Sequence, residues 1–407
     1  MLRRPAPLSW LGGFVVLDKP PMMTSTACCN RMRRFIDAER VGHAGTLDPM
    51  ASGVLPLALN GATKALQFVM VQDKCYRFTV RWGAETDTDD VTGRVVRRVP
   101  DSAVRVSSDD LERVLDLYRH RELSQLPPQY SALRINGERA HDIARRGQHA
   151  PLLPRPVRIN EFFVEQADAA SASFFVRVSR GTYVRSLARD IGRDLGVLGH
   201  VTALRRTSVG PFGEDDAVSF EQLADATDVM QFLRPIASVL SMPVIRIKGH
   251  DAVMLSRGTA LTVDITALER APDELENETD VAPPVPMTTR ERRASRFLAV
   301  NSVDESPIAI TELHGSQIRP VQIFAVPEKI AAVEERSKLR QLALQAGAEP
   351  ILADLKRSSR RRRPSTFAQA VAQASKEAHL ASGEGAPPTI SEAPPPPPPA
   401  AATVSLA

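Results

Sequence analysis

The chain has 407 residues, 43% of them hydrophobic, and a formal net charge of +4. That length exceeds a usual single domain, so a main domain with a smaller one is expected. Six positive charges without an acid lie between Lys356 and Arg363, and +4 less these six leaves −2 for the rest of the chain, which excludes a uniformly basic nucleic-acid binder.

The N-terminal residues resemble a signal peptide only faintly, and we interpret the apolar run at 8–17 as a buried strand. Arg3 and Arg4 precede a short apolar run, but Asp18 and Lys19 close it and no small-residue cleavage site follows. No apolar stretch is long enough to cross a bilayer. Three cysteines without Cys-x-x-Cys spacing argue against a metal knuckle and a disulfide framework. We therefore expect a cytoplasmic protein that does not associate with membranes.

The first elements follow ordinary local patterns. A strand is predicted at 14–17, and a helix at 24–36 begins at three consecutive hydroxyl residues. Strands are predicted at 54–59 and 76–82, around a short helix at 62–70. In the last strand, Tyr76 alternates with polar residues together with Phe78 and Val80, so Tyr76 faces inward.

A glycine- and proline-rich loop at 42–56 carries one carboxylate, Asp48. Pro49 biases Asp48 toward an extended backbone, while the glycines permit turns that other residues resist. Two interpretations fit these residues, a catalytic aspartate or an Asx-type turn, and for an isolated Asp-Pro the turn is the more common.

A basic segment follows at 126–150, interrupted by Pro127, Pro128, Gly137 and Gly147. Such a segment fits an RNA-gripping insertion, and it equally fits a solvated loop and helix. Farther on, apolar residues recur at helical spacing from Tyr183 to Leu195. Tyr183 and Arg185 fall in the first turn of that helix, where a phosphate or the carboxylate of Asp48 would be favoured.

The pattern restarts after Met242 with predicted strands at 244–247, 297–300, 308–312 and 317–324 and a short helix ending near Gly258. Between them, 264–295 is rich in acids and prolines. The residues beyond 326 have a composition typical of disorder, apart from a possible helix at 328–345.

Three segments, in this order, resemble the signatures of the bacterial tRNA pseudouridine-55 synthases: Gly42 to Lys64, residues 73–78 (Asp-Lys-Cys-Tyr-Arg-Phe) and residues 179–187 (Ser-Arg-Gly-Thr-Tyr-Val-Arg-Ser-Leu). The resemblance extends from about 13 to 220, and more weakly through 243–325. It implies an α+β fold with a mixed, mainly antiparallel central sheet flanked by helices, followed by a small β-rich domain of PUA type and a disordered tail.

The resemblance implies a division of the chain into four parts. They are an N-terminal extension at 1–12, a catalytic domain at 13–242 with an RNA-gripping insertion at 124–150, an accessory RNA-binding domain at 243–326 with a low-complexity insertion at 264–295, and a tail at 327–407.

The resemblance also implies roles for individual residues. Asp48 would act at the ribose, either as the nucleophile that attacks C1′ or by promoting removal of the 2′ proton, and Arg185 would keep its carboxylate charged. Tyr76 would stack on the flipped base and assist a proton transfer at C5. The other implied pocket residues are Tyr183, Leu204, whose backbone would meet the uracil edge, Lys19 and His43, whose planar ring would occupy the space left by the flipped nucleotide. Arg205 and Arg206 are expected to contact phosphates.

Isomerisation of uridine needs no cofactor, which agrees with the lack of dinucleotide, phosphate-loop and zinc motifs. The implied partner is the T-arm stem-loop of tRNA, and we expect a monomer. For three residues a purely structural role remains an alternative: a core aromatic for Tyr76, a turn cap for His43 and a surface charge for Lys19.

Two rival functions stay open on the residues alone. One is a tRNA-folding chaperone that acts independently of catalysis. The other is a glycoside hydrolase-like enzyme, because Asp48 and the acidic stretch from Glu85 to Asp90 offer paired carboxylates.

Overall fold

The computed structural model describes residues 12–240, 242–263, 296–325, 328 and 330. The expected insertion at 264–295, residues 1–11 of the expected extension, and all of the expected tail and its possible helix except 328 and 330 lie outside the described residues. In the described part, no helix is long and apolar enough to span a bilayer.

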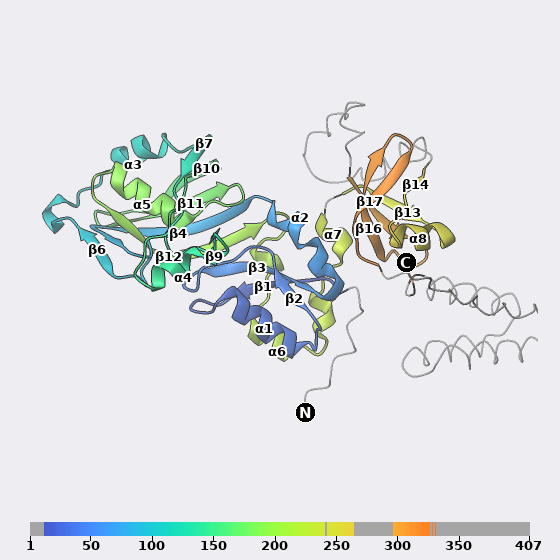
Figure 1. Cartoon of the computed structure of the whole chain (residues 1–407). Coiled ribbons are helices and arrows are strands. Elements are labelled where there is room, and N and C mark those ends of the chain that lie inside the picture. The colour runs from blue at the N-terminus through green and yellow to red at the C-terminus, as the bar shows by residue number, and fades with distance from the viewer. Residues whose placement is uncertain (1–11, 241, 264–295, 326–327, 329, 331–407) are drawn as a thin grey trace, which may run out of the picture. The chain divides into compact units, whose positions relative to one another are not determined.

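The larger of the two main sheets in the described chain has eight strands (Figure 1). Its strand order is β1-β3-β12-β4-β11-β10-β7, and β2 pairs with β3 outside this path. The bounds are β1 Phe14–Lys19, β2 Val41–His43, β3 Ser52–Leu59, β4 Lys74–Trp82, β7 Arg121–Gln125, β10 Arg155–Ala167, β11 Ser171–Val178 and β12 Gly199–Val209. All neighbours are antiparallel except β3 and β12. The expected mixed, mainly antiparallel sheet is confirmed.

Helices cover one face of this sheet. They are α1 Ser25–Phe35, α3 Ser108–Leu115, α5 Val184–Asp194 and α6 Phe220–Asp225. All four contribute to one hydrophobic core that includes Met32, Leu111, Leu187 and Phe220, and Figure 1 shows α3 beside α5 and α1 beside α6. A second apolar cluster contains Phe14 and Val16 of β1 together with Val239 of α7 (Ile236–Leu240).

Local signals account for several of these elements. The Thr24 side chain accepts a hydrogen bond from the backbone N–H of Ala27 and so caps α1. In β4, Tyr76, Phe78 and Val80 are buried while their neighbours are more exposed, which confirms that Tyr76 faces inward. The helix expected at 62–70 is different, because a 3₁₀ turn at Asn60–Ala65 comes before the short helix α2 at Leu66–Met70.

The segment at 126–150 contains a small hairpin and a short helix. Strands β8 (Arg134–Ile135) and β9 (Glu138–Arg139) pair, and α4 (Ala140–Arg145) follows directly. The remaining elements before α7 are the strands β5 Ala84–Thr86 and β6 Val95–Arg98 and the 3₁₀ turns η2 Asp101–Ala103, η3 Glu214–Asp216 and η4 Val229–Phe232.

A five-stranded sheet follows α7, with the order β13-β15-β16-β17-β14. Its elements are β13 Val244–Ile247, α8 Gly249–Ser256, β14 Leu261–Thr262, β15 Arg296–Asn301, β16 Pro307–His314 and β17 Gln317–Ile323. Leu255 of α8 and Ile308 of β16 belong to one buried cluster, so this sheet has a core of its own. The expected small β-rich C-terminal part is confirmed.

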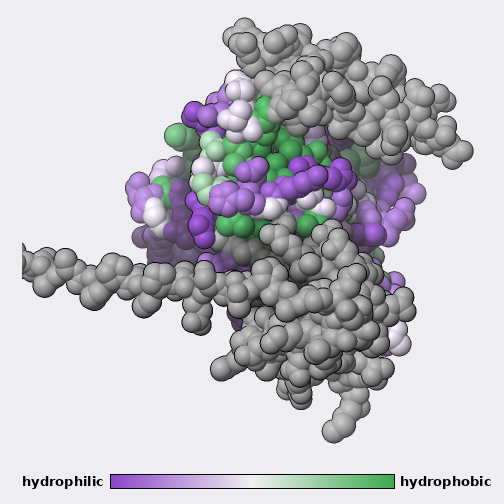
Figure 2. Space-filling view, turned by 90° about the vertical axis from the view of Figure 1, so that its right-hand side faces the viewer, coloured by the Kyte–Doolittle hydropathy of each residue, from purple (hydrophilic) through white to green (hydrophobic). Residues whose placement is uncertain are grey.

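Surface hydropathy alone does not single out a functional face on the side shown in Figure 2. There, hydrophobic residues (green) lie among hydrophilic ones (purple) over the visible described residues. The candidate site is therefore located from its residues and their contacts.

Candidate active site

A buried lysine binds the main chain of the loop that carries Asp48. The Nζ of Lys19 donates hydrogen bonds to the carbonyl oxygens of Pro20, Pro49 and Ala51 at 2.9, 3.1 and 2.6 Å. Lys19 has no exposed surface, and burial lowers its pKa. Its alternative interpretation as a surface charge is wrong, because the buried ammonium fastens the main chain directly after Asp48.

A buried arginine ties the two ends of the loop together. Arg206 donates from Nε to the carbonyl of Val54 at 2.7 Å and from Nη2 to the carbonyl of Gly45 at 3.1 Å. Gly53 packs against the backbone of the same arginine with φ +101°, a conformation that L side chains rarely adopt. This packing holds the loop beside β12.

Neither arginine of β12 is free to contact phosphate as expected. Arg206 has no exposed surface and donates to main-chain carbonyls. Arg205 pairs with Asp18 at 3.0 Å and with Glu214 at 2.5 Å. The prediction is wrong for Arg206, because successive side chains of a strand point to opposite faces of the sheet and that of Arg206 points into the protein. Arg205 is already neutralised by two carboxylates.

Asp48 meets Arg185 through a bidentate ion pair. Arg185 Nε lies 2.8 Å from Asp48 Oδ2, and Nη2 lies 2.7 Å from Oδ1. The arginine side chain is 4% exposed, whereas the carboxylate retains 28% exposure. Burial opposes the charge of Arg185, but Asp48 and then Asp90 outweigh it and raise the arginine's pKa. A permanent cation therefore faces a carboxylate that remains accessible from one side.

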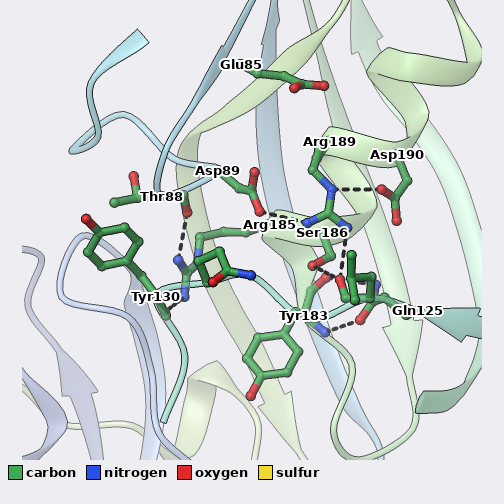
Figure 3. Close-up of polar contacts among 12 residues, drawn as sticks. Glu85, Thr88, Asp89, Gln125, Tyr130, Tyr183, Arg185, Ser186, Arg189 and Asp190 are labelled. Carbon is green, nitrogen blue, oxygen red and sulfur yellow. Dashed lines mark hydrogen bonds and ion pairs between the residues drawn. The ribbon is translucent and has the colours of Figure 1, made fainter. Parts of the chain in front are cut away.

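The other hydrogen bonds of Arg185 go to the main chain. Nη1 donates to the carbonyl of Thr88 at 2.7 Å, and Nη2 donates to that of Tyr130 at 3.0 Å, as Figure 3 shows. Asp90 approaches the same guanidinium at 3.6 Å. The acidic stretch from Glu85 to Asp90 thus supports arginines, since Glu85 pairs with Arg193 as well, and this use disfavours the paired-carboxylate chemistry of a glycosidase.

A cavity of about 930 Å³ opens beside Asp48. Tyr76, Tyr183 and Leu204 line it together with the Asp48 loop. Tyr76 and Leu204 are each 7% exposed and belong to the paired strands β4 and β12. The cavity thus brings an accessible carboxylate and two aromatic rings together, at a size suited to a small ligand.

Tyr183 is the residue before α5 and is fastened by a side chain from β7. Gln125 accepts from the Tyr183 N–H at 2.8 Å and donates to the Tyr183 carbonyl at 3.1 Å. Burial raises the pKa of Tyr183, so its phenol is neutral at physiological pH.

His43 lies on β2, outside the set of residues that line the cavity. Its Nδ1 is buried without a hydrogen-bond partner in the described part of the chain. Burial and then the charge of Arg206 lower the pKa of His43. The ring is therefore neutral at physiological pH. The role expected for His43 needs a planar ring and no change of protonation.

Basic residues that were not assigned roles from the sequence also lie at the cavity. Lys74, Arg155 and Arg180 line it, and Arg155 and Arg180 are exposed. Among the described residues neither arginine forms an ion pair. Lys74 and Arg180 lie inside two of the motifs that drew attention to Tyr76 and Tyr183, so their basic character was a usable signal, whereas Arg155 lies in no motif. Thr88 and Tyr130 act through main-chain carbonyls, which no side-chain pattern reveals.

Comparisons with known proteins agree with this arrangement. The N-terminal domain of the TruB family pseudouridylate synthases matches residues 33–184, and the C-terminal domain of tRNA pseudouridylate synthase B matches 185–241. Asp48 and Arg185 lie in different matched domains.

Two similar proteins are bacterial enzymes. The chain is 47% identical over 259 residues to tRNA pseudouridine synthase B of Rhodopseudomonas palustris, covering 61% of this chain and 70% of that protein. It is 39% identical over 318 residues to tRNA pseudouridine synthase B of Brucella anthropi, covering 77% and 96%.

Among solved structures, one chain of a Cbf5-Nop10-Gar1 complex is similar with a TM-score of 0.55 and 22% identity. That match covers 79% of this chain and 87% of the other. It supports the fold.

Proposed function

The chain belongs to the TruB family of pseudouridylate synthases, and we propose that it converts uridine 55 in the T-arm loop of tRNA to pseudouridine, with Asp48 as the catalytic carboxylate. The enzyme is a tRNA pseudouridine synthase, an isomerase. The observation that carries the proposal is the bidentate contact of buried Arg185 with a carboxylate that stays open to the cavity.

The reaction breaks the bond between C1′ of the ribose and N1 of uracil and forms one between C1′ and C5. A charged carboxylate beside the ribose either attacks C1′ or assists deprotonation while the glycosidic bond breaks. Arg185 supports both routes, because it holds the Asp48 oxygens by two charge-assisted hydrogen bonds. C5 loses a proton and N1 gains one, so the product is an isomer of the substrate.

The cavity suits a base that has left its stack. Extrusion of a nucleotide costs a few kcal/mol, which stacking on an aromatic side chain helps to offset. Tyr76 offers such a face from β4, and Leu204 and Tyr183 border the same space. A detached uracil held there can turn and present C5 to the ribose before it diffuses away.

Basic residues around the cavity suit the phosphates next to the flipped nucleotide. Arg155 and Arg180 are exposed and supply this charge locally, which matters because the net charge without the Lys356–Arg363 stretch is not positive. We place the substrate-facing role on these residues in place of Arg205 and Arg206. The proposed setting is the cytoplasm, where tRNA is modified, and the proposed active unit is one chain.

The test compares the wild-type enzyme with Asp48→Asn on a transcribed tRNA labelled with tritium at C5 of uridine. The wild type is expected to release tritium and place pseudouridine at position 55, and Asp48→Asn is expected to bind tRNA within about threefold of wild type without release. A tRNA with cytidine at position 55 is the substrate control. Turnover by Asp48→Asn, or product at another position, would contradict the proposal.

A further inference from the structure

The segment at 124–150, termed the insertion, is fastened to the first two turns of α5 at its N-terminal end. Gln125 exchanges two hydrogen bonds with the main chain of Tyr183. The next carbonyl, that of Leu126, accepts from Ser186 Oγ at 2.9 Å and from Arg189 Nη2 at 2.9 Å. Figure 3 shows these side chains converging from α5 on the start of the insertion.

These contacts are made by polar groups that have almost no access to solvent. Gln125, Ser186 and Arg189 are 5%, 0% and 6% exposed. Buried polar groups destabilise a fold unless they are satisfied, so side chains in such a place hold their partners firmly. Arg189 is neutralised by Asp89 at 3.0 Å and Asp190 at 2.9 Å, and it still directs one N–H to the Leu126 carbonyl.

The two ends of the insertion are tied to each other. Gln129 accepts from the backbone N–H of Ala150 at 2.8 Å and donates to the Ala150 carbonyl at 3.3 Å. Fixing the first end on α5 therefore also restrains where the insertion returns to the sheet.

The insertion also shares an arginine with the catalytic carboxylate. Nη2 of Arg185 contacts both Asp48 Oδ1 and the Tyr130 carbonyl. A movement of Tyr130 removes one of the contacts that orient the guanidinium, and the Asp48 oxygens then lose a fixed donor. The position of the insertion and the orientation of Asp48 are thus connected through one side chain.

We propose that Gln125, Ser186 and Arg189 form a buried clamp that holds the start of the insertion on α5 and thereby keeps Arg185 aligned with Asp48. They are positioning residues, since none of their side chains lines the cavity, and Gln125 reaches it only through the main chain of Tyr183. The activity part of this inference rests on the proposed function, whereas the clamp itself is tested without RNA.

The choice of variants avoids an unpaired buried charge. Arg189→Gln would leave Asp89 without its cation, so loss of folding could obscure the result. The double variant Gln125→Leu with Ser186→Ala removes three hydrogen bonds and no charge. Ser256→Ala is the matched control, because Ser256 is also a buried helical serine that donates to a main-chain carbonyl, that of Val253 at 2.6 Å in α8.

The first measurement is limited trypsin digestion of the free protein. Arg134, Arg139, Arg145 and Arg146 are exposed cleavage sites in the insertion. In the double variant, cleavage there is expected to be at least about tenfold faster than in wild type, because the loss of three ordinary hydrogen bonds corresponds to about 1.5 kcal/mol or more. Ser256→Ala is expected to be cleaved at the wild-type rate. Equal cleavage in the double variant and wild type would overturn the clamp, whatever the enzyme does to tRNA.

The second measurement is single-turnover pseudouridine formation at saturating tRNA. The double variant is expected to be about tenfold slower than wild type, with a Kd for tRNA changed by less than about threefold. An unchanged rate with accelerated cleavage would overturn the link to Arg185. If the wild type itself forms no pseudouridine at position 55, the proposed function fails while the digestion still decides the clamp.

Discussion

Arg185 and Asp48 are 137 residues apart in the chain, yet the guanidinium holds both carboxylate oxygens at 2.7 and 2.8 Å. The arginine reaches the loop from the first turn of α5, and its remaining donors go to Thr88 and Tyr130. The pair therefore joins four segments of the chain, and its geometry depends on all of them.

Arg185→Lys is expected to lower the single-turnover rate of pseudouridine formation by about 10²–10³-fold. Lysine keeps the charge but cannot hold two oxygens and two carbonyls at once, and the loss of two hydrogen bonds to a charged group amounts to about 3–4 kcal/mol. Arg193→Lys, on the same helix but paired with Glu85, is the control. A rate within threefold of wild type for Arg185→Lys would refute the expectation.

Lys19→Met is expected to reduce the free energy of unfolding by about 3 kcal/mol, because three carbonyls lose their buried donor. Urea denaturation measures this loss. Lys248→Met, at an exposed position, should change stability by less than about 0.5 kcal/mol. Equal stability of the two variants would show that Lys19 does not support the loop.

Gly53→Ala is expected to destabilise the protein by about 3 kcal/mol or more and to abolish activity. A Cβ there would lie 2.2 Å from the carbonyl oxygen of Arg206, at φ +101°. Gly213→Ala is the control, because a Cβ at Gly213 meets nothing within 4 Å. Thermal unfolding of both variants checks the contrast, and a wild-type melting temperature for Gly53→Ala would contradict it.

We expect the free energy of unfolding to increase at alkaline pH because of Lys74. Burial, followed by the charge of Arg206, lowers its pKa from 10.5 to about 8. Between these values the unfolded chain binds more protons than the folded one, so the free energy of unfolding increases as pH rises from about 8 to 10.5. The full difference corresponds to about 3 kcal/mol.

The check is chemical denaturation at several pH values for wild type and Lys74→Met, with Lys248→Met as the control. The rise attributed to Lys74 should disappear only in Lys74→Met. The same slope in both variants would assign it to other groups.

Local sequence patterns predicted much of the fold. The alternation at Tyr76, Phe78 and Val80 predicted the inward face of β4, and the hydroxyl at Thr24 predicted the start of α1. These features depend on backbone geometry and on neighbours a few residues away, which the sequence displays directly. The motifs at 42–64, 73–78 and 179–187 likewise located the loop, the strand and the helix that border the cavity.

Only the tertiary structure decided which charged residues are buried and what they bind. Lys19, Arg205 and Arg206 have the same formal charge, yet Lys19 holds the Asp48 loop, Arg206 joins its ends and Arg205 pairs with two carboxylates. The reason is physical: the free energy of a charge depends on its solvation and on partners brought near by folding. The resemblance of three motifs therefore drew attention to Asp48, and long-range packing determined how Arg185 holds it.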